Sequence, residues 1–141
     1  MGYVGLPLAI EFSKKFNVIG FDISSERISS LLEGVDLTNE IEPSMLNSSN
    51  LVLTDNEEML SSADIYIVTV PTPIDSDKKP DLSPLLNATR TIAKKINKGN
   101  IIIYESTVYP GLTEEVCLPL ISKISKLNIN KELTKLCLFV A

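Results

Sequence analysis

The sequence contains no histidine, which excludes a Ser-His-Asp triad and a histidine-based zinc site within this chain. Its two cysteines, Cys117 and Cys137, are too few and too far apart for a disulfide framework or a metal knuckle, and we expect both to be reduced core thiols. No apolar run reaches the roughly 20 residues of a membrane span. The apolar start lacks a basic stretch and is interrupted by Glu11, Lys14 and Lys15, unlike a signal peptide. We therefore expect no metal, no membrane partner and a cytoplasmic location.

Positive charge is also scarce: the sequence contains 13 Lys and Arg against 18 Asp and Glu, which gives a net charge of −5. A nucleic-acid partner would require clustered basic residues, so we expect none. A chain of 141 residues with 44% hydrophobic content can bury one core and is too short for two ordinary domains. We therefore expect one domain over residues 1–141.

A glycine pair opens the chain. Gly2-Tyr3-Val4-Gly5 matches the second and third glycines of a G-x-G-x-x-G fingerprint, whose first glycine and strand would lie before Met1. Such glycines let the backbone approach a pyrophosphate, and an acid about 20 residues later binds a ribose hydroxyl. Asp22 stands at that place, after the strand pattern 17–23.

Helix and strand patterns alternate along the chain without repeats, which predicts an α/β fold with a mostly parallel sheet. Helices are expected at 6–16, from Ser24 or Ser25 to the Gly34 stop, from an Asp55 cap to 60 and from a Ser83 cap to 98. A last helix is expected from 113, and Pro119 should kink it near Glu115. Strands are expected at 17–23, 51–53, 64–70, 100–104 and 136–140, and a loop broken by Pro43 at 35–50. The strand at 64–70 is rich in β-branched residues, which predicts burial on both faces.

Two loops follow strands of this expected sheet, at the edge where open α/β sheets bind ligands. They are Val70-Pro71-Thr72-Pro73 and Glu105-Ser106-Thr107-Val108-Tyr109-Pro110-Gly111. In each loop, prolines restrict the turn and leave a hydroxyl group and backbone groups for a ligand. Ordinary turn chemistry explains either loop alone, but not both together with the glycine pair.

These segments together resemble the UDP-glucose/GDP-mannose dehydrogenase family over essentially the whole chain. The resemblance implies a Rossmann-like, doubly wound fold that lacks its first strand, and NAD as the cofactor. Asp77-Lys78-Lys79-Pro80-Asp81-Leu82-Ser83-Pro84-Leu85 and Tyr109-Pro110-Gly111 look more like the branch that oxidises UDP-N-acetylhexosamines for bacterial surface polysaccharides. Leu112 departs from the small or polar residue usual at its position, which concerns local loop packing.

By this resemblance, the enzyme oxidises C6 of a UDP-sugar to the uronic acid with two NAD, and the full-length protein is a homo-oligomer. Gly2 and Gly5 would border the pyrophosphate, Asp22 would hold the adenosine ribose, and Thr107 would orient the catalytic water. The implied cofactor-binding residues are Gly2, Tyr3, Val4, Gly5, Asp22, Arg27, Val70, Pro71, Thr72, Glu105, Ser106 and Thr107.

The nucleophilic cysteine of the family has no counterpart here, since Cys117 follows Glu114-Glu115-Val116 in a helix pattern that indicates packing. The substrate domain would also lie beyond Ala141, so we expect a fragment at both ends that is inactive alone. Three alternatives remain: the NAD-binding part of a nucleotide-sugar dehydrogenase, a binding-only module, and a truncated product. The runner-up family is the β-hydroxyacid type of NAD(P) dehydrogenase.

Overall fold

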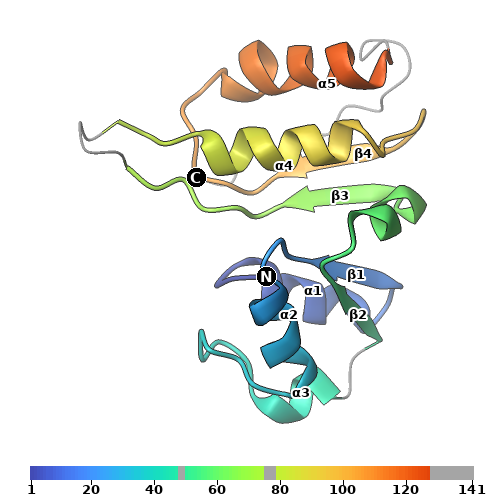
Figure 1. The fold of residues 1–141 in the computed structure, drawn as a ribbon, viewed down its shortest axis with the longest axis vertical. Coiled ribbons are helices and arrows are strands. Elements are labelled where there is room, and N and C mark those ends of the chain that lie inside the picture. The colour runs from blue at the N-terminus through green and yellow to red at the C-terminus, as the bar shows by residue number, and fades with distance from the viewer. Residues whose placement is uncertain (48–49, 75–78, 128–141) are drawn as a thin grey trace. The chain divides into compact units, whose positions relative to one another are not determined.

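The protein, seen here in a computed structural model that describes residues 1–47, 50–74 and 79–127, divides into two compact units. The units are Met1–Leu60 and Ser61–Ala141, and each contains one pair of parallel strands with helices packed on it (Figure 1). The α/β class and the parallel strands expected from the sequence are confirmed.

The first unit holds the glycine pair and Asp22. Its elements are α1 (Gly5–Ser13), β1 (Val18–Phe21), α2 (Ser25–Leu32), α3 (Pro43–Asn47) and β2 (Leu51–Thr54), followed by the 3-10 helix η1 (Glu57–Ser62). Strand β1 pairs with β2 in parallel, with Val18 opposite Leu51 and Phe21 opposite Thr54. This register places Asp22 and Asp55 at the same carboxyl edge.

The ends of α2 follow from local sequence. Ser24 is extended and its Oγ accepts the Arg27 N–H at 3.1 Å, as the expected cap does. At the other end Gly34 adopts a φ of 79°, and hydrogen bonds run from the N–H of Gly34 to Leu31 O and from Val35 to Ser30 O. Glycine suits this turn because a left-handed φ carries no Cβ penalty there.

Leu6, Ile10 and Leu31 form the core of the first unit and join α1 to α2. Partly buried side chains from the N-terminus, from the segment between α2 and β2 and from β2 pack against them: Met1, Ile41, Leu46, Leu51 and Leu53. Leu32, the next residue of α2, is instead 65% exposed. Because Leu6 directly follows Gly5, the glycine turn at the start of α1 is joined to this core.

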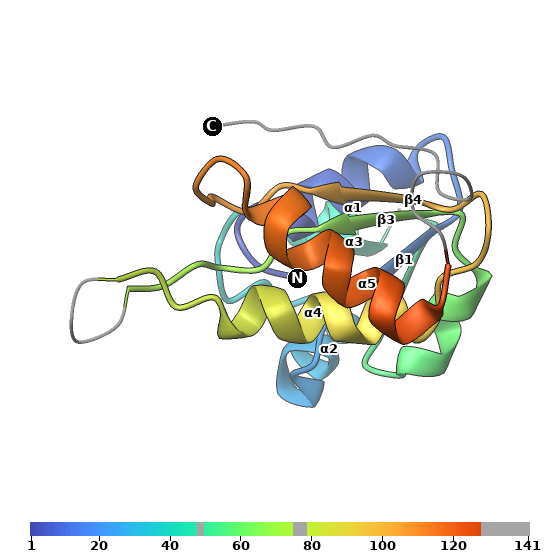
Figure 2. The ribbon, with the colours of Figure 1, turned by 90° about the horizontal axis from the view of Figure 1, so that it is seen from above.

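The second unit holds the two proline-containing loops. Its elements are β3 (Ile65–Val68), α4 (Ser83–Ala93), β4 (Ile101–Tyr104), the π-helical turn η2 (Thr113–Cys117) and α5 (Leu118–Ser125). Strand β3 pairs with β4 in parallel, with Ile65 opposite Ile101. Helix α4 packs against β3, and α5 packs against α4, so that the two helices run side by side in both views (Figures 1 and 2).

Several expected details were wrong. The loop at 35–50 contains α3, because a proline with its preset φ suits the first residue of a helix. The cap before η1 is Asn56, whose Oδ1 accepts the Glu58 N–H at 3.0 Å, rather than Asp55. Ser83 lies inside α4, after Leu82 as the N-cap, and the helix ends at Ala93 instead of residue 98.

Two further expectations concern burial and helix continuity. Ile65 is 53% exposed, so β3 is not buried on both faces over its length. The interruption expected from Pro119 is present as a π-helical turn before α5, because proline supplies no N–H for the preceding turn. The strand expected at 136–140 lies outside the described residues. Within the described ranges, none of the helices is both long and apolar enough to cross a membrane.

Candidate functional site

The glycine pair forms the turn into α1. The Leu6 N–H donates to Gly2 O at 3.1 Å and the Leu8 N–H to Val4 O at 3.2 Å. Among the described residues, no side chain caps the N-terminus of α1, and its first turn holds no acidic residue. A Cβ built on Gly2 would meet nothing within 4 Å, so packing does not require glycine there. Free amides and the positive end of the helix dipole make this turn suitable for an anion.

Asp22 follows β1 and stands beside that turn. Its Oδ1 accepts the Ser24 N–H at 3.0 Å, and its Oδ2 contacts the amino group of Met1. The carboxylate side chain is 21% exposed. It therefore sits at the carboxyl end of the strand with part of its surface open to a polar ligand.

Arg27 lies in the first turn of α2, near Asp22. Its Nε donates to Met1 O at 2.8 Å, so Arg27 and Asp22 contact the same residue. Its Nη2 donates to Asp36 Oδ1 at 2.7 Å and to Thr38 Oγ1 at 3.3 Å. Its Nη1 is buried and finds no hydrogen-bond partner within the described part of the chain.

Asp36 was not among the expected site residues, yet it holds Arg27 in place. Its side chain is only 2% exposed, and it accepts hydrogen bonds from Thr38 N and Oγ1 at 3.0 and 2.7 Å. The backbone N–H groups of Glu40 and Ile41 donate to its Oδ2 at 2.9 and 3.1 Å. The Asp-x-Thr spacing of 36–38 is a local turn motif that could have drawn attention to this loop.

The hydrogen bonds of Asp36 keep it ionised. Burial alone would raise the pKa of the Asp36 carboxyl, but hydrogen bonds from Thr38 and Arg27 outweigh burial and hold that pKa well below its ordinary value. The Arg27–Asp36 pair is therefore a buried ion pair over the working pH range of most proteins.

In the second unit, hydrogen bonds join the two expected loops. Thr72 Oγ1 donates to Thr107 O at 2.7 Å, and Ser106 Oγ donates to Val70 O at 2.7 Å. The Glu105 N–H continues the strand pairing by donating to Val68 O at 2.8 Å. Residues from loops that are far apart in sequence thus meet at the carboxyl ends of β3 and β4.

Exposure differs among these expected site residues. Ser106 is 7% exposed, whereas Thr107 and Pro71 are exposed, and Thr72 and Glu105 are half-buried. In the first unit, Tyr3 is 69% and Val4 54% exposed. Ser106 therefore fastens the loop from within, while the Thr107 side chain is available to a ligand.

A buried polar contact lies below the second loop. The hydroxyl oxygens of Thr89 and Tyr104 are 2.9 Å apart, and Thr89 Oγ1 donates to Leu85 O at 2.8 Å.

Cys117 is fully buried and free, and burial raises the pKa of its thiol. A buried protonated thiol is a poor nucleophile, so the expectation that Cys117 is a core residue is confirmed. Cys137 lies outside the described residues.

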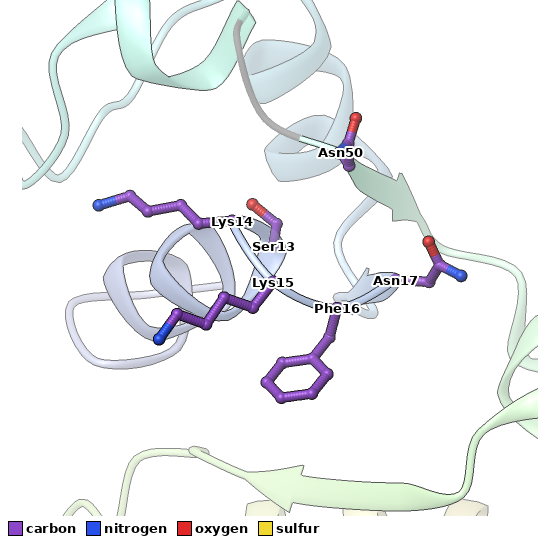
Figure 3. A pocket seen from close by; sticks show the side chains of 6 residues that line it. All are labelled: Ser13, Lys14, Lys15, Phe16, Asn17 and Asn50. Carbon is purple, nitrogen blue, oxygen red and sulfur yellow. The ribbon is translucent and has the colours of Figure 1, made fainter.

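A shallow pocket of about 350 Å³ lies elsewhere in the first unit, lined by Ser13, Lys14, Lys15, Phe16, Asn17 and Asn50. These residues precede β1 and β2, so the pocket is at the amino ends of the strands, opposite the edge that carries Asp22. Its side chains point in different directions and do not converge (Figure 3). The Lys14 ammonium contacts the Glu11 carboxylate. The pocket is therefore not the candidate site. Separately, the described part of the chain contains no acidic or cysteine cluster suited to a metal ion.

Several known proteins are similar to this chain in sequence. A family model described as "UDP-glucose/GDP-mannose dehydrogenase family, NAD binding domain" matches residues 1–136. A UDP-N-acetyl-D-glucosamine 6-dehydrogenase of Pseudomonas aeruginosa is 52% identical over 133 residues, which make up 94% of this chain and 32% of that protein. Protein CapL of Staphylococcus aureus is 50% identical over 132 residues, 94% of this chain and 31% of that protein.

Solved structures show the same relationship. The structure of a UDP-D-ManNAc dehydrogenase from Pyrococcus horikoshii superposes with a TM-score of 0.85 at 36% identity, covering 94% of this chain and 32% of that one. A GDP-mannose dehydrogenase from Pseudomonas aeruginosa, solved as a ternary complex, gives a TM-score of 0.83 at 26% identity, covering 94% and 33%. The chain spans about a third of the length of the relatives it matches.

Proposed function

This chain belongs to the UDP-glucose/GDP-mannose dehydrogenase family, and from that premise we propose that residues 1–141 are the NAD-binding domain of a nucleotide-sugar 6-dehydrogenase. NAD is the cofactor of this domain in the family. The proposed reaction of the whole protein is oxidation of the C6 hydroxyl of a UDP-sugar to the uronic acid, with two NAD. The family match favours this function over that of a β-hydroxyacid dehydrogenase.

The residues of the first unit fit NAD. The uncapped N-terminus of α1, with no acid in its first turn, suits the pyrophosphate. The partly exposed Asp22 carboxylate suits the ribose diol. This carboxylate, at the carboxyl end of β1 beside the glycine turn, is the observation that carries the proposal. NAD supplies the hydride acceptor when it is bound.

We also propose roles for the loop residues of the second unit, and the geometry of the two loops supports them. The Thr72 hydroxyl donates to the carbonyl group of Thr107, and the Thr107 side chain is exposed after the end of β4. We assign Thr107 to orientation of the water that hydrolyses the thioester, and Val70, Pro71, Thr72, Glu105 and Ser106 to the cofactor path. We also assign the whole protein to the cytoplasm, as a homo-oligomer.

The substrate class is proposed from two relatives. The UDP-N-acetyl-D-glucosamine 6-dehydrogenase shares 52% identity with this chain, and a UDP-N-acetyl-D-mannosamine dehydrogenase of Pyrococcus horikoshii shares 40%. We therefore propose a UDP-N-acetylhexosamine as the substrate, and synthesis of capsule or another surface polysaccharide as the use of the product.

Asp22→Ala is expected to weaken NAD binding by about tenfold or more, because each hydrogen bond to a charged group contributes about 1.5–3 kcal/mol. It should also reduce discrimination against NADP, since the carboxylate repels the 2′-phosphate. Calorimetric titration of the 141-residue chain with each dinucleotide measures both effects. Asp55→Ala, which removes the exposed acid after β2, is the matched control and should bind NAD normally. Equal affinities before and after Asp22→Ala would contradict the proposal.

A chimera tests the reaction. This chain replaces the matching 32% of the Pseudomonas aeruginosa UDP-N-acetyl-D-glucosamine 6-dehydrogenase, to which it is 52% identical. We expect the chimera to form NADH from NAD and UDP-N-acetylglucosamine, measured by absorbance. Thr107→Ala in the chimera should lower kcat by roughly 100-fold, the lower end of the range for a group that assists proton transfer, while the far-UV circular dichroism of the chimera stays unchanged. A chimera that folds and binds NAD but forms no NADH would refute the assignment.

A further inference from the structure

The adenosine end of the proposed cofactor site holds a carboxylate and a guanidinium together. Asp22 and Arg27 both contact Met1, one through its amino group and the other through its carbonyl oxygen. These groups have opposite effects on cofactor choice. A carboxylate at the ribose favours NAD, whereas an arginine nearby can accommodate the 2′-phosphate of NADP.

Asp36 already neutralises this arginine. Arg27 Nη2 donates to Asp36 Oδ1 at 2.7 Å, and the two side chains are 12% and 2% exposed. The Nε of Arg27 donates to Met1 O, which leaves only the buried Nη1. Two of the three guanidinium nitrogen atoms are therefore hydrogen-bonded before any cofactor arrives, and the third is buried.

Asp36 is itself held by its own loop and not only by Arg27. Backbone N–H groups of Thr38, Glu40 and Ile41 donate to its two oxygens at 2.9–3.1 Å. An arginine that turned toward a 2′-phosphate would leave this buried carboxylate without its counter-ion, which is a costly arrangement. The loop thus holds the carboxylate in place and thereby restrains the guanidinium.

We propose that Asp36 is a specificity-determining residue, which excludes NADP by keeping the Arg27 guanidinium in an ion pair and away from the 2′-phosphate of the cofactor. This inference rests on the proposed function, because it requires the adenosine ribose to lie at Asp22. It adds a second determinant to Asp22, one that acts through Arg27 and without contact between Asp36 and the cofactor.

The test is the ratio of NADP affinity to NAD affinity, measured by calorimetry on the 141-residue chain and on Asp36→Asn. Released Arg27 should form a charge-assisted contact with the 2′-phosphate, so the ratio should rise by about tenfold or more. The rise should come from tighter NADP binding and should shrink at high salt. A partly unfolded sample lowers both apparent affinities by the same factor, so a merely structural role for Asp36 leaves the ratio unchanged.

Three further variants make the result decisive. In the double variant Asp36→Asn with Arg27→Met, the ratio should return toward that of the parent chain, because no guanidinium remains. Asp55→Asn, an exposed acid after β2, should leave the ratio unchanged. If Asp36→Asn does not fold, Thr38→Val decides, since it removes one hydrogen bond to each member of the pair without removing a charge. It should raise the ratio by about threefold, in the same direction.

The outcomes separate this inference from the proposed function. An unchanged ratio in folded Asp36→Asn or Thr38→Val, with NAD binding retained, overturns the role of Asp36 and leaves the proposed function standing. A ratio that rises equally in the double variant also overturns it, because Arg27 is then not involved. A parent chain that binds neither dinucleotide refutes the proposed function, and the role of Asp36 with it.

Discussion

Replacement of Asp36 by alanine is expected to lower the free energy of unfolding by about 3–5 kcal/mol, the range for loss of one partner from a buried ion pair. The side chain of Asp36 is 2% exposed and that of Arg27 12% exposed, so water cannot replace the lost carboxylate fully. The backbone N–H groups of Glu40 and Ile41 would lose their acceptor at the same time. Urea denaturation followed by far-UV circular dichroism measures the change.

The pH dependence of this loss identifies its electrostatic origin. The folded protein holds the pKa of the Asp36 carboxyl below its usual 3.8, so the ionised group stabilises the fold. This contribution is fully present above the pKa of the unfolded chain and is lost as the pH falls below that value. The difference in stability between the parent chain and Asp36→Ala should therefore be constant from pH 7 to 5 and shrink below about pH 4.

Asp55→Ala is the matched control for stability, because Asp55 is an exposed acid in the same unit. Its effect should stay within about 0.5 kcal/mol, as for most surface substitutions. A difference between parent and Asp36→Ala that grows in acid, or a loss as small as that of Asp55→Ala, would show that the ion pair contributes little.

Leu6→Ala is expected to cost about 2–5 kcal/mol, the range for truncation of a buried leucine. Leu6 is 0% exposed and packs with Ile10 and Leu31 between α1 and α2. It also directly follows Gly5, so a cavity at this position would loosen the turn that leads into α1. We therefore expect weaker NAD binding together with the lost stability.

Two variants calibrate the loss of stability in Leu6→Ala, which urea denaturation measures. Leu6→Met nearly conserves volume and should cost less than about 1.5 kcal/mol. Leu32→Ala removes the same atoms from an exposed leucine of α2, 65% exposed, and should cost about 0.5 kcal/mol or less. A Leu6→Ala chain as stable as Leu32→Ala would show that the described core is not the one that stabilises the unit.

Local sequence predicted most of the strands and the start of α2, for specific reasons. The apolar run at 100–104 favours a strand that is buried in a sheet, and it forms β4 at Ile101–Tyr104. Ser24 and Gly34 act within one turn of the backbone, so their effects need no distant partner. Helix ends were less predictable: α4 stops at Ala93 although the helical pattern continues to residue 98.

The candidate site divides in the same way. The sequence by itself determined the glycine turn, the acid at Asp22 and the presence of two loops after strands, because each is written in neighbouring residues. Only the tertiary structure decided that Asp36 neutralises Arg27 and that Thr72 binds the carbonyl group of Thr107. Each of these contacts joins residues of different segments, which tertiary packing brings together. No spacing rule within a short window of sequence specifies that packing, since the whole unit determines it.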